Sequence, residues 1–135
     1  MTHRRNRRLP LSVLALFILP SVVAAEDSAT WGEDVAAAMV AAKSDGKDLL
    51  MNFTGSDWCI WCIRLEKEVF SEIEFAAPVE KDFVLVKLDF PKDKSGLSPE
   101  TIQQNDRWRA SFEVNGFPSV YLADAEGRPY AKTGY

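Results

Sequence analysis

The stretch DLLMNFTGSDWCIWC, residues 48–62, contains three successive local patterns. Residues 48–53 form a mainly apolar run of strand length, and residues 54–57 are of the types that favour turns. A helix is predicted from Trp58 to about Phe75, because apolar residues recur there at helical spacing. Its apolar face is expected to carry Cys62, Leu65, Val69 and Ile73. The cysteine pair therefore lies where a strand gives way to a helix.

The position of the two cysteines suits thiol–disulfide exchange. A helix N-terminus presents unsatisfied N–H groups and the positive end of the helix dipole, which stabilise a thiolate. A cysteine there can have its pKa lowered from about 8.5 into the range of roughly 3.5–7.5. Cys62 lies nearly one turn further on and faces back toward Cys59. Attack by Cys59 on a substrate disulfide can therefore be followed by closure of a Cys59–Cys62 bond.

Other uses of the pair fit less well. Zinc takes about four ligands, so two thiols bind it only if a second chain contributes. Attachment of c-type haem needs a histidine directly after the second cysteine, where this sequence has Ile63. A purely structural disulfide across two intervening residues constrains the chain little. Redox chemistry without any further cofactor is the favoured interpretation, and an inert disulfide or a metal held between two chains are the alternatives.

The remaining elements predict a mixed α/β sheet. A helix is expected over residues 31–43, capped by Thr30 or Ser28, and Pro78 is expected to break or kink the helix that carries the cysteines. Strands are predicted at residues 83–89, 119–123 and 128–133, the last two as a hairpin. Another helix is predicted from Ser98-Pro99 to a left-handed cap near Asn115-Gly116. Strand–helix–strand order calls for parallel pairing with right-handed crossovers. Trp31 and Trp108 are assigned to the core.

The first 25 residues have the pattern of a secretory signal peptide. Four arginines precede an apolar run over residues 9–19, and Val23-Ala24-Ala25 offers small residues for cleavage before Glu26. A retained membrane anchor is the alternative, but the uncharged run is short for a spanning helix. The sequence thus divides into a signal peptide, residues 1–25, and one domain, residues 26–135, located in the periplasm or secreted without stable insertion in the membrane.

Charge and composition exclude several functions of the mature chain. The whole chain has 135 residues, 16 basic and 20 acidic, with a net charge of -4. Residues 1–25 hold four of the basic residues, none of the acidic ones and the only histidine, so 110 residues with a net charge of -8 remain. Such an acidic chain is a poor nucleic-acid binder. Without histidine it has no Ser-His-Asp triad, no Cys-His protease pair and no histidine metal site.

The sequence from about residue 48 to 135 resembles the thioredoxin superfamily. The matching motifs are Phe53, the run Asp57-Trp58-Cys59-Ile60-Trp61-Cys62, the strand Val84–Asp89 and the segment Val114–Pro118. Within the superfamily the sequence is most similar to exported bacterial thioredoxin-like proteins, of which the C-terminal domain of DsbD is one. The resemblance implies a thioredoxin-like mixed sheet flanked by helices and a protein thiol–disulfide oxidoreductase activity.

The resemblance also implies roles for individual residues. Cys59 is expected to be the exposed nucleophile and Cys62 the resolving thiol. Pro118 is expected to follow a cis peptide bond after Phe117, beside the motif, where the neighbouring backbone pairs with an extended substrate. Trp58 is assigned as a platform beside the site, and Trp61 as an exposed aromatic residue that touches substrate. Protein thiols or disulfides are the expected partners, with a membrane electron donor as a further candidate.

Two departures from the family pattern matter for function. Asn52 falls where the family often keeps a buried aspartate that takes the proton of the second cysteine, and an amide cannot do so. Glu66, one turn after Cys62, is a candidate substitute, with a solvated surface residue as the alternative. The sequence also lacks the family's C-terminal helix, so we expect a partly bare area on one sheet face and a chain cut short at its C-terminus. Alternatively, the helix over residues 31–43 covers part of this area.

A thioredoxin-fold binding or chaperone-like module with an inert cysteine pair is the alternative function.

Overall fold

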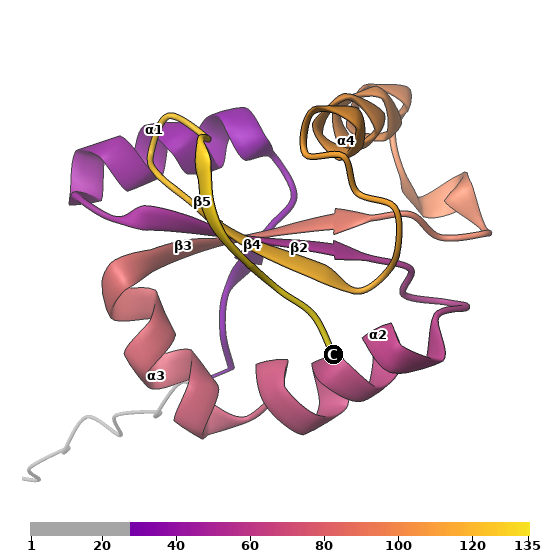
Figure 1. Cartoon of the computed structure of the whole chain (residues 1–135), viewed down its shortest axis with the longest axis horizontal. Coiled ribbons are helices and arrows are strands. Elements are labelled where there is room, and N and C mark those ends of the chain that lie inside the picture. Colours follow the sequence, from indigo (N-terminus) through magenta and orange to yellow (C-terminus); the bar gives the residue numbers. More distant parts are fainter. Residues whose placement is uncertain (1–27) are drawn as a thin grey trace, which may run out of the picture.

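The computed structural model describes residues 28–135, so the predicted signal peptide lies outside the described residues. Its centre is a five-stranded sheet in the order β1-β3-β2-β4-β5 (Figure 1). The strands are β1 (Trp31–Gly32), β2 (Asp48–Thr54), β3 (Phe83–Asp89), β4 (Ser119–Ala123) and β5 (Pro129–Thr133). β3 pairs in parallel with β1 and β2, whereas β4 runs antiparallel to both β2 and β5. The predicted mixed sheet with a hairpin at one edge is confirmed.

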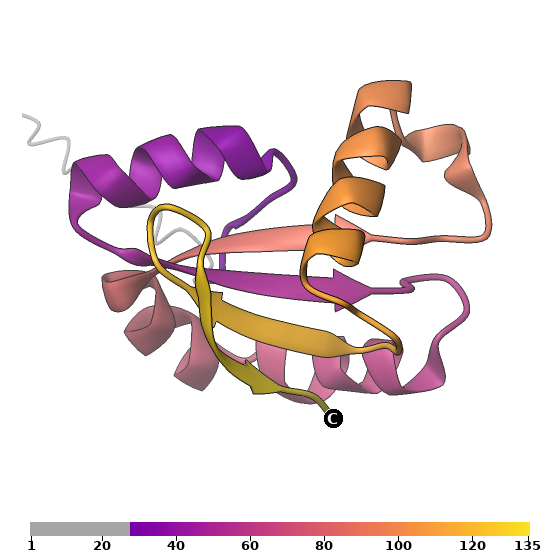
Figure 2. The same ribbon diagram turned by 45° about the horizontal axis from the view of Figure 1, so that its top comes forward.

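Helices cover both faces of the sheet. α1 (Val35–Asp45) and α4 (Pro99–Ser111) lie on one face, and α2 (Ile60–Leu65), η1 (Glu66–Phe70) and α3 (Ile73–Asp82) lie on the other (Figure 2). A short 3-10 helix, η2 (Lys94–Gly96), lies between β3 and α4. α1 lies on the face opposite α2, so the alternative in which it covers the area left by the missing C-terminal helix does not hold. β5 is the last element, and all five of its residues are exposed. No helix within residues 28–135 has the length and apolar character needed to cross a bilayer.

β2 is the central strand, and its successive side chains pack alternately into two separate cores. Leu49, Met51 and Phe53 point into the core beneath α1 and α4, whereas Leu50 packs into the core beneath α2 and α3. Burial of both faces explains why this strand is a nearly continuous apolar run. The strand ends at Thr54, so the turn that carries the cysteines leaves the sheet from the carboxyl end of its central strand.

The first helix begins later than predicted. Trp31 and Gly32 form an edge strand beside Leu85 and Val86, and α1 starts only at Val35. The cap is Asp34, whose Oδ1 accepts a hydrogen bond from the backbone N–H of Ala37 at 3.0 Å. Pairing with β3 overrides helix propensity here, because it also packs Trp31 against Phe70 with ring centroids 4.8 Å apart. The assignment of Trp31 and Trp108 to the core is confirmed, although both are partly exposed.

The predicted single helix over residues 58–75 is in fact three segments. A π-turn follows α2, in which the N–H of Ser71 donates to the carbonyl of Glu66 at 2.9 Å. The extra residue in this turn shifts the apolar stripe by one position, so Phe70 is buried while Ile73 is 52% exposed. Pro78 lies inside α3 and does not break it. The helix loses one backbone hydrogen bond there, but packing of Phe75 and Val79 on the core beneath α3 maintains it.

The last helix matches the prediction at its start but not at its end. Ser98 caps α4, its Oγ accepting from the N–H of Thr101 at 3.1 Å, and Pro99 occupies the first turn. The helix ends at Ser111, four residues before the predicted cap. The left-handed residue is Glu113, with φ of 50°, and not Gly116. The buried Phe112 explains the early end, because its carbonyl accepts the hydroxyl of Tyr121 at 3.0 Å.

Candidate active site

Cys59 and Cys62 form a disulfide at the start of α2, with their Cα atoms 5.2 Å apart. Cys59 is the cap residue of α2, and its Sγ accepts the N–H of Cys62 at 3.2 Å. Cys62 Sγ accepts the N–H of Gly55 at 3.5 Å. Donors aimed at both sulfur atoms favour a thiolate once the bond is reduced, because a hydrogen bond to the charged form stabilises that form.

Both cysteines are almost fully enclosed in the disulfide form. Cys59 is 6% exposed and Cys62 is 4% exposed. The expectation of an exposed Cys59 is therefore not met. The physical reason is that the Cys59 sulfur turns inward, toward the N–H of Cys62 and the sulfur to which it is bonded.

The turn that precedes Cys59 is tied to the end of β3. Asp57 accepts the backbone N–H groups of Lys92 and Asp93 at 2.9 and 3.0 Å. Both hydrogen bonds lower the pKa of the Asp57 carboxyl, and the bond from Asp93 has the larger effect. Trp58 Nε1 donates to the carbonyl of Phe90 at 2.8 Å. Hydrogen bonds across more than 30 residues of sequence thus hold the turn in place.

The peptide bond between Phe117 and Pro118 is cis, which confirms that expectation. Phe117 meets the ring of Trp58 edge-on, with centroids 5.9 Å apart, and lies 5.1 Å from Phe90. Arg109 covers the Phe90 and Phe117 rings at 5.6 and 5.2 Å. The structure therefore brings Trp58 together with Phe117 and Pro118 beside the cysteine turn. Trp58 is 42% exposed, so part of its indole remains accessible.

Trp61 lies on the other side of the turn, in a cluster that sequence reasoning missed. Its ring is 51% exposed and lies 6.1 Å from Tyr135. The Arg64 guanidinium covers both rings, at 5.3 and 5.6 Å. Glu68 accepts Arg64 Nε at 3.0 Å and also the hydroxyl of Tyr135. The hydroxyl of Tyr135 and then Arg64 lower the pKa of Glu68.

A cleft of about 420 Å³ is lined in part by Cys62. Thr54 and Ser56 line it from the end of β2 and the turn, Glu66 and Lys67 from η1, and Lys87 from β3. Asn52 is 3% exposed, and its Oδ1 has no hydrogen-bond partner among the described residues. It pairs in register with Lys87 across the β2–β3 ladder. Asn52 is thus buried at the position where the family often keeps an aspartate.

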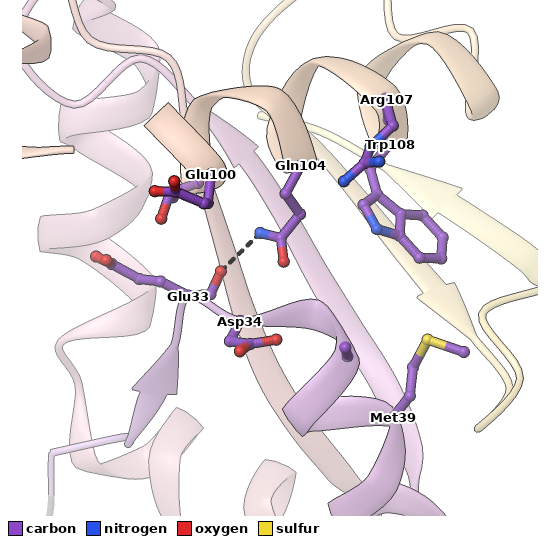
Figure 3. Close-up of a pocket in the computed structure, with 9 residues that line it drawn as sticks. Glu33, Asp34, Met39, Glu100, Gln104, Arg107 and Trp108 are labelled. Atoms are coloured by element: carbon purple, nitrogen blue, oxygen red, sulfur yellow. Dashed lines mark hydrogen bonds between the residues drawn. The ribbon is translucent and has the colours of Figure 1, made fainter. Parts of the chain in front are cut away.

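A second pocket, of about 410 Å³, lies between α1 and α4 on the opposite face of the sheet (Figure 3). Its polar groups already serve the fold: Gln104 Nε2 donates to the carbonyl of Glu33 at 2.8 Å, and Asp34 caps α1. No group of three or more His, Cys, Asp or Glu side chains within residues 28–135 is arranged to hold a metal ion. Because this pocket lies between α1 and α4, on the face of the sheet opposite the cysteines, it does not belong to the cysteine site.

Known proteins resemble this chain in sequence and in structure. A disulfide bond reductase, DsbH, of Chlamydia pneumoniae is 36% identical over 103 residues, which are 76% of this chain and 61% of DsbH. The thioredoxin-related protein DsbJ of the same organism is 34% identical over 133 residues, which are 92% of this chain and 38% of DsbJ. The chain thus spans less than two thirds of the length of these relatives.

Solved structures agree on the fold. A DsbH oxidoreductase superposes with a TM-score of 0.76 at 32% identity, covering 92% of this chain and 83% of that one. The C-terminal domain of DsbD from Neisseria meningitidis, at 20% identity and a TM-score of 0.51, shares the fold over 73% of this chain and 77% of its own. The family model described as a thioredoxin-like domain matches residues 35–135. From its sheet, its cysteine turn, its cis-proline and these matches, the chain belongs to the thioredoxin-like family.

Proposed function

We propose that the protein is an exported thiol–disulfide oxidoreductase that exchanges disulfides with protein thiols through Cys59 and Cys62. The observation that carries the proposal is the paired cysteines at the start of α2, with a backbone N–H directed at each sulfur. The similarity to a protein named a disulfide bond reductase supports the same chemistry.

The reaction follows from the order of the two thiols. In the reduced protein, the Cys59 thiolate attacks one sulfur of a substrate disulfide, and the other substrate sulfur leaves as a thiolate. The Cys62 thiolate then attacks Cys59 Sγ, which forms the intramolecular disulfide and releases the second substrate sulfur. Two electrons pass from the cysteine pair to the substrate, and the reverse sequence oxidises a substrate dithiol.

Substrate is proposed to lie across the face formed by four residues beside the pair: Trp58, Trp61, Phe117 and Pro118. An extended substrate segment would pair with the backbone next to Pro118, as the family resemblance implies. Trp61 supports this arrangement because its half-exposed ring lies directly in the Cys59–Cys62 turn. A membrane electron donor, and a location in the periplasm or outside the cell, belong to the same proposal.

Reduction of insulin disulfides by dithiothreitol tests the activity. The protein should accelerate precipitation of the insulin B chain, and Cys59→Ser should abolish the acceleration, because Cys62 alone cannot form the intramolecular disulfide that releases the substrate. Equal activity of the Cys59→Ser variant would show that the proposal is wrong. Ser111→Ala, a change at the end of α4, is a matched control that should retain full activity.

A binding module with an inert cysteine pair is the second candidate. The low exposure of both cysteine residues is the observation that favours it. Alkylation of the reduced protein with iodoacetamide separates the two functions: an oxidoreductase has one thiol that reacts fast near neutral pH, whereas an inert module reacts slowly at both.

A further inference from the structure

An arginine without a carboxylate partner lies beside the proposed substrate face. Arg109 is in the last turn of α4, shortly before the loop that leads through Phe117 to β4 (Figure 1). Its side chain is exposed, and no carboxylate of residues 28–135 lies within 4.0 Å of its guanidinium. Arg64 and Arg128, by contrast, each pair with a carboxylate at 3.0 Å or less. The charge of Arg109 is therefore not neutralised by direct contact.

Backbone contacts and two aromatic rings fix the orientation of this guanidinium. The carbonyl of Arg109 accepts the N–H of Val114 at 3.0 Å, and Arg109 Nε donates to the carbonyl of Val114 at 3.3 Å. The guanidinium carbon lies 5.6 Å from the ring centroid of Phe90 and 5.2 Å from that of Phe117. Of the guanidinium N–H groups, only that on Nε has an acceptor in the described part of the chain. The terminal N–H groups are therefore available to a ligand.

We propose that Arg109 is a specificity-determining residue of the substrate face, and that it binds an acidic side chain near the substrate cysteine that reacts with Cys59. This inference rests on the proposed oxidoreductase function. The terminal N–H groups of a guanidinium form a fork that can donate two parallel hydrogen bonds to one carboxylate. Because the rings and the Nε bond already orient the fork, little side-chain freedom is lost when a carboxylate binds.

Aromatic side chains connect this cation to the cysteine turn. The Phe117 ring lies 5.2 Å from the guanidinium of Arg109 and meets the ring of Trp58 at 5.9 Å, and Trp58 directly precedes Cys59. An extended segment advances about 3.3 Å per residue. We therefore expect the acidic side chain about two to four residues from the substrate cysteine, with the intervening residues lying over the aromatic rings.

Two acidic residues of this chain lie near Arg109 without neutralising it. Asp106 and Glu113 line, together with Arg109, a cleft of about 510 Å³ at the end of α4. Neither carboxylate is within ion-pair distance of the guanidinium. A substrate carboxylate that is hydrogen-bonded to the guanidinium would be closer to the positive charge than either acid is, and charge attraction rises as the separation falls.

Peptide disulfides that differ only in charge test this preference. Three peptides share a central cysteine and carry Glu, Gln or Lys at the third position on either side of it, and each is used as its symmetric disulfide dimer. Single-turnover reduction by the reduced protein gives a second-order rate constant for each. Arg109→Met should lower the ratio of the Glu-peptide rate to the Lys-peptide rate about two- to fivefold, the range of an exposed ion pair. Comparing this ratio between variants cancels the effect of peptide charge on the disulfide itself.

Arg107→Met is the matched control, because Arg107 is exposed on the same helix and its loss changes the net charge equally. Arg107 lines the pocket between α1 and α4, so its substitution should leave the ratio unchanged. Arg109→Glu should lower the ratio below that of Arg109→Met, an effect that a merely structural role of the arginine would not produce. Arg109→Lys should restore part of the ratio, since it keeps the charge but loses the fork.

Equal slowing of all three peptides in Arg109→Met, an unchanged ratio, or an equal loss in Arg107→Met overturns the inference and leaves the oxidoreductase function intact. Failure of the unsubstituted protein to reduce any of the peptides overturns the oxidoreductase function instead, and with it the inference that rests on it.

Discussion

Gly55 shows how one small residue fixes the cysteine turn. A Cβ atom at this position would lie 2.6 Å from Cε2 of Trp58, well inside van der Waals contact. The close approach lets Trp58 Nε1 reach the carbonyl of Phe90 at 2.8 Å while the N–H of Gly55 points at Cys62 Sγ. Gly55 therefore allows the close packing of Trp58 and also donates a hydrogen bond to the cysteine pair.

We expect Gly55→Ala to destabilise the protein by about 1–3 kcal/mol, the usual cost of an added methyl group in a packed site. The indole of Trp58 must move, so its hydrogen bond to Phe90 should weaken. Urea unfolding measures the free energy of unfolding. Gly96→Ala is the matched control, because nothing lies within 4 Å of a Cβ atom there. Equal stability of the two variants would contradict the steric argument.

At the scale of single residues, the cysteine pair could be predicted from local sequence, and the cis peptide bond before Pro118 from the resemblance to the thioredoxin superfamily. The cluster of Trp61, Arg64, Glu68 and Tyr135 could not. Tyr135 and Glu68 are 67 residues apart in sequence, and only the strand order β2-β4-β5 brings the end of β5 toward α2. The burial of Cys59 was also not predictable, because it depends on the inward turn of its sulfur.

Among the elements, the loop between β2 and α2 is held in part by Asp57. Its carboxylate accepts two backbone N–H groups from the loop after β3, and these bonds hold its pKa below the ordinary value of 3.8. A carboxyl whose folded pKa lies below its unfolded pKa stabilises the fold above the unfolded value. This stabilisation is lost as the pH falls through the folded value.

We therefore expect Asp57→Asn to lower the free energy of unfolding at neutral pH, where the charge-assisted bonds are complete. The difference from the unsubstituted protein should begin to shrink as the pH falls below about 4, where the unfolded chain takes up the proton, and should vanish once the pH lies below the folded pKa of Asp57. Urea unfolding at several pH values measures this. Asp106→Asn, an exposed change on α4, should show no such trend. A difference that stays constant down to acid pH would contradict the role of the charge.

The helical segment that follows Cys62 could be predicted only in part from the spacing of its apolar residues. Its existence and its buried start at Cys62 and Leu65 were predictable from spacing. The π-turn was not, because one inserted residue leaves the composition unchanged and only moves the apolar stripe. Packing of Phe70 against Trp31 and Phe75 accounts for the new register.

At the scale of the whole molecule, the order of strands and helices was enough to predict a mixed sheet, and the resemblance to the thioredoxin superfamily predicted the flanking helices. Strand β1 was missed because two residues are too few for a periodic signal. β2 contributes to both cores, so the cysteine turn follows the most buried strand of the sheet. A rigid base of this kind suits a site whose atoms must be held within tenths of an ångström.

The uneven charge of the chain leads to a last prediction. Four arginines, an apolar run and small residues before Glu26 predict export and cleavage after Ala25. When a bacterium expresses the full sequence, we expect periplasmic protein whose N-terminal residue is Glu26, as measured by N-terminal sequencing and intact mass. Leu14→Arg places a charge in the apolar run, at a cost of about 2.5–3.5 kcal/mol for membrane insertion, and should leave uncleaved protein in the cytoplasm. Recovery of the unsubstituted chain at full length in the membrane fraction would instead establish a retained anchor, and would tether the Cys59–Cys62 site to the bilayer.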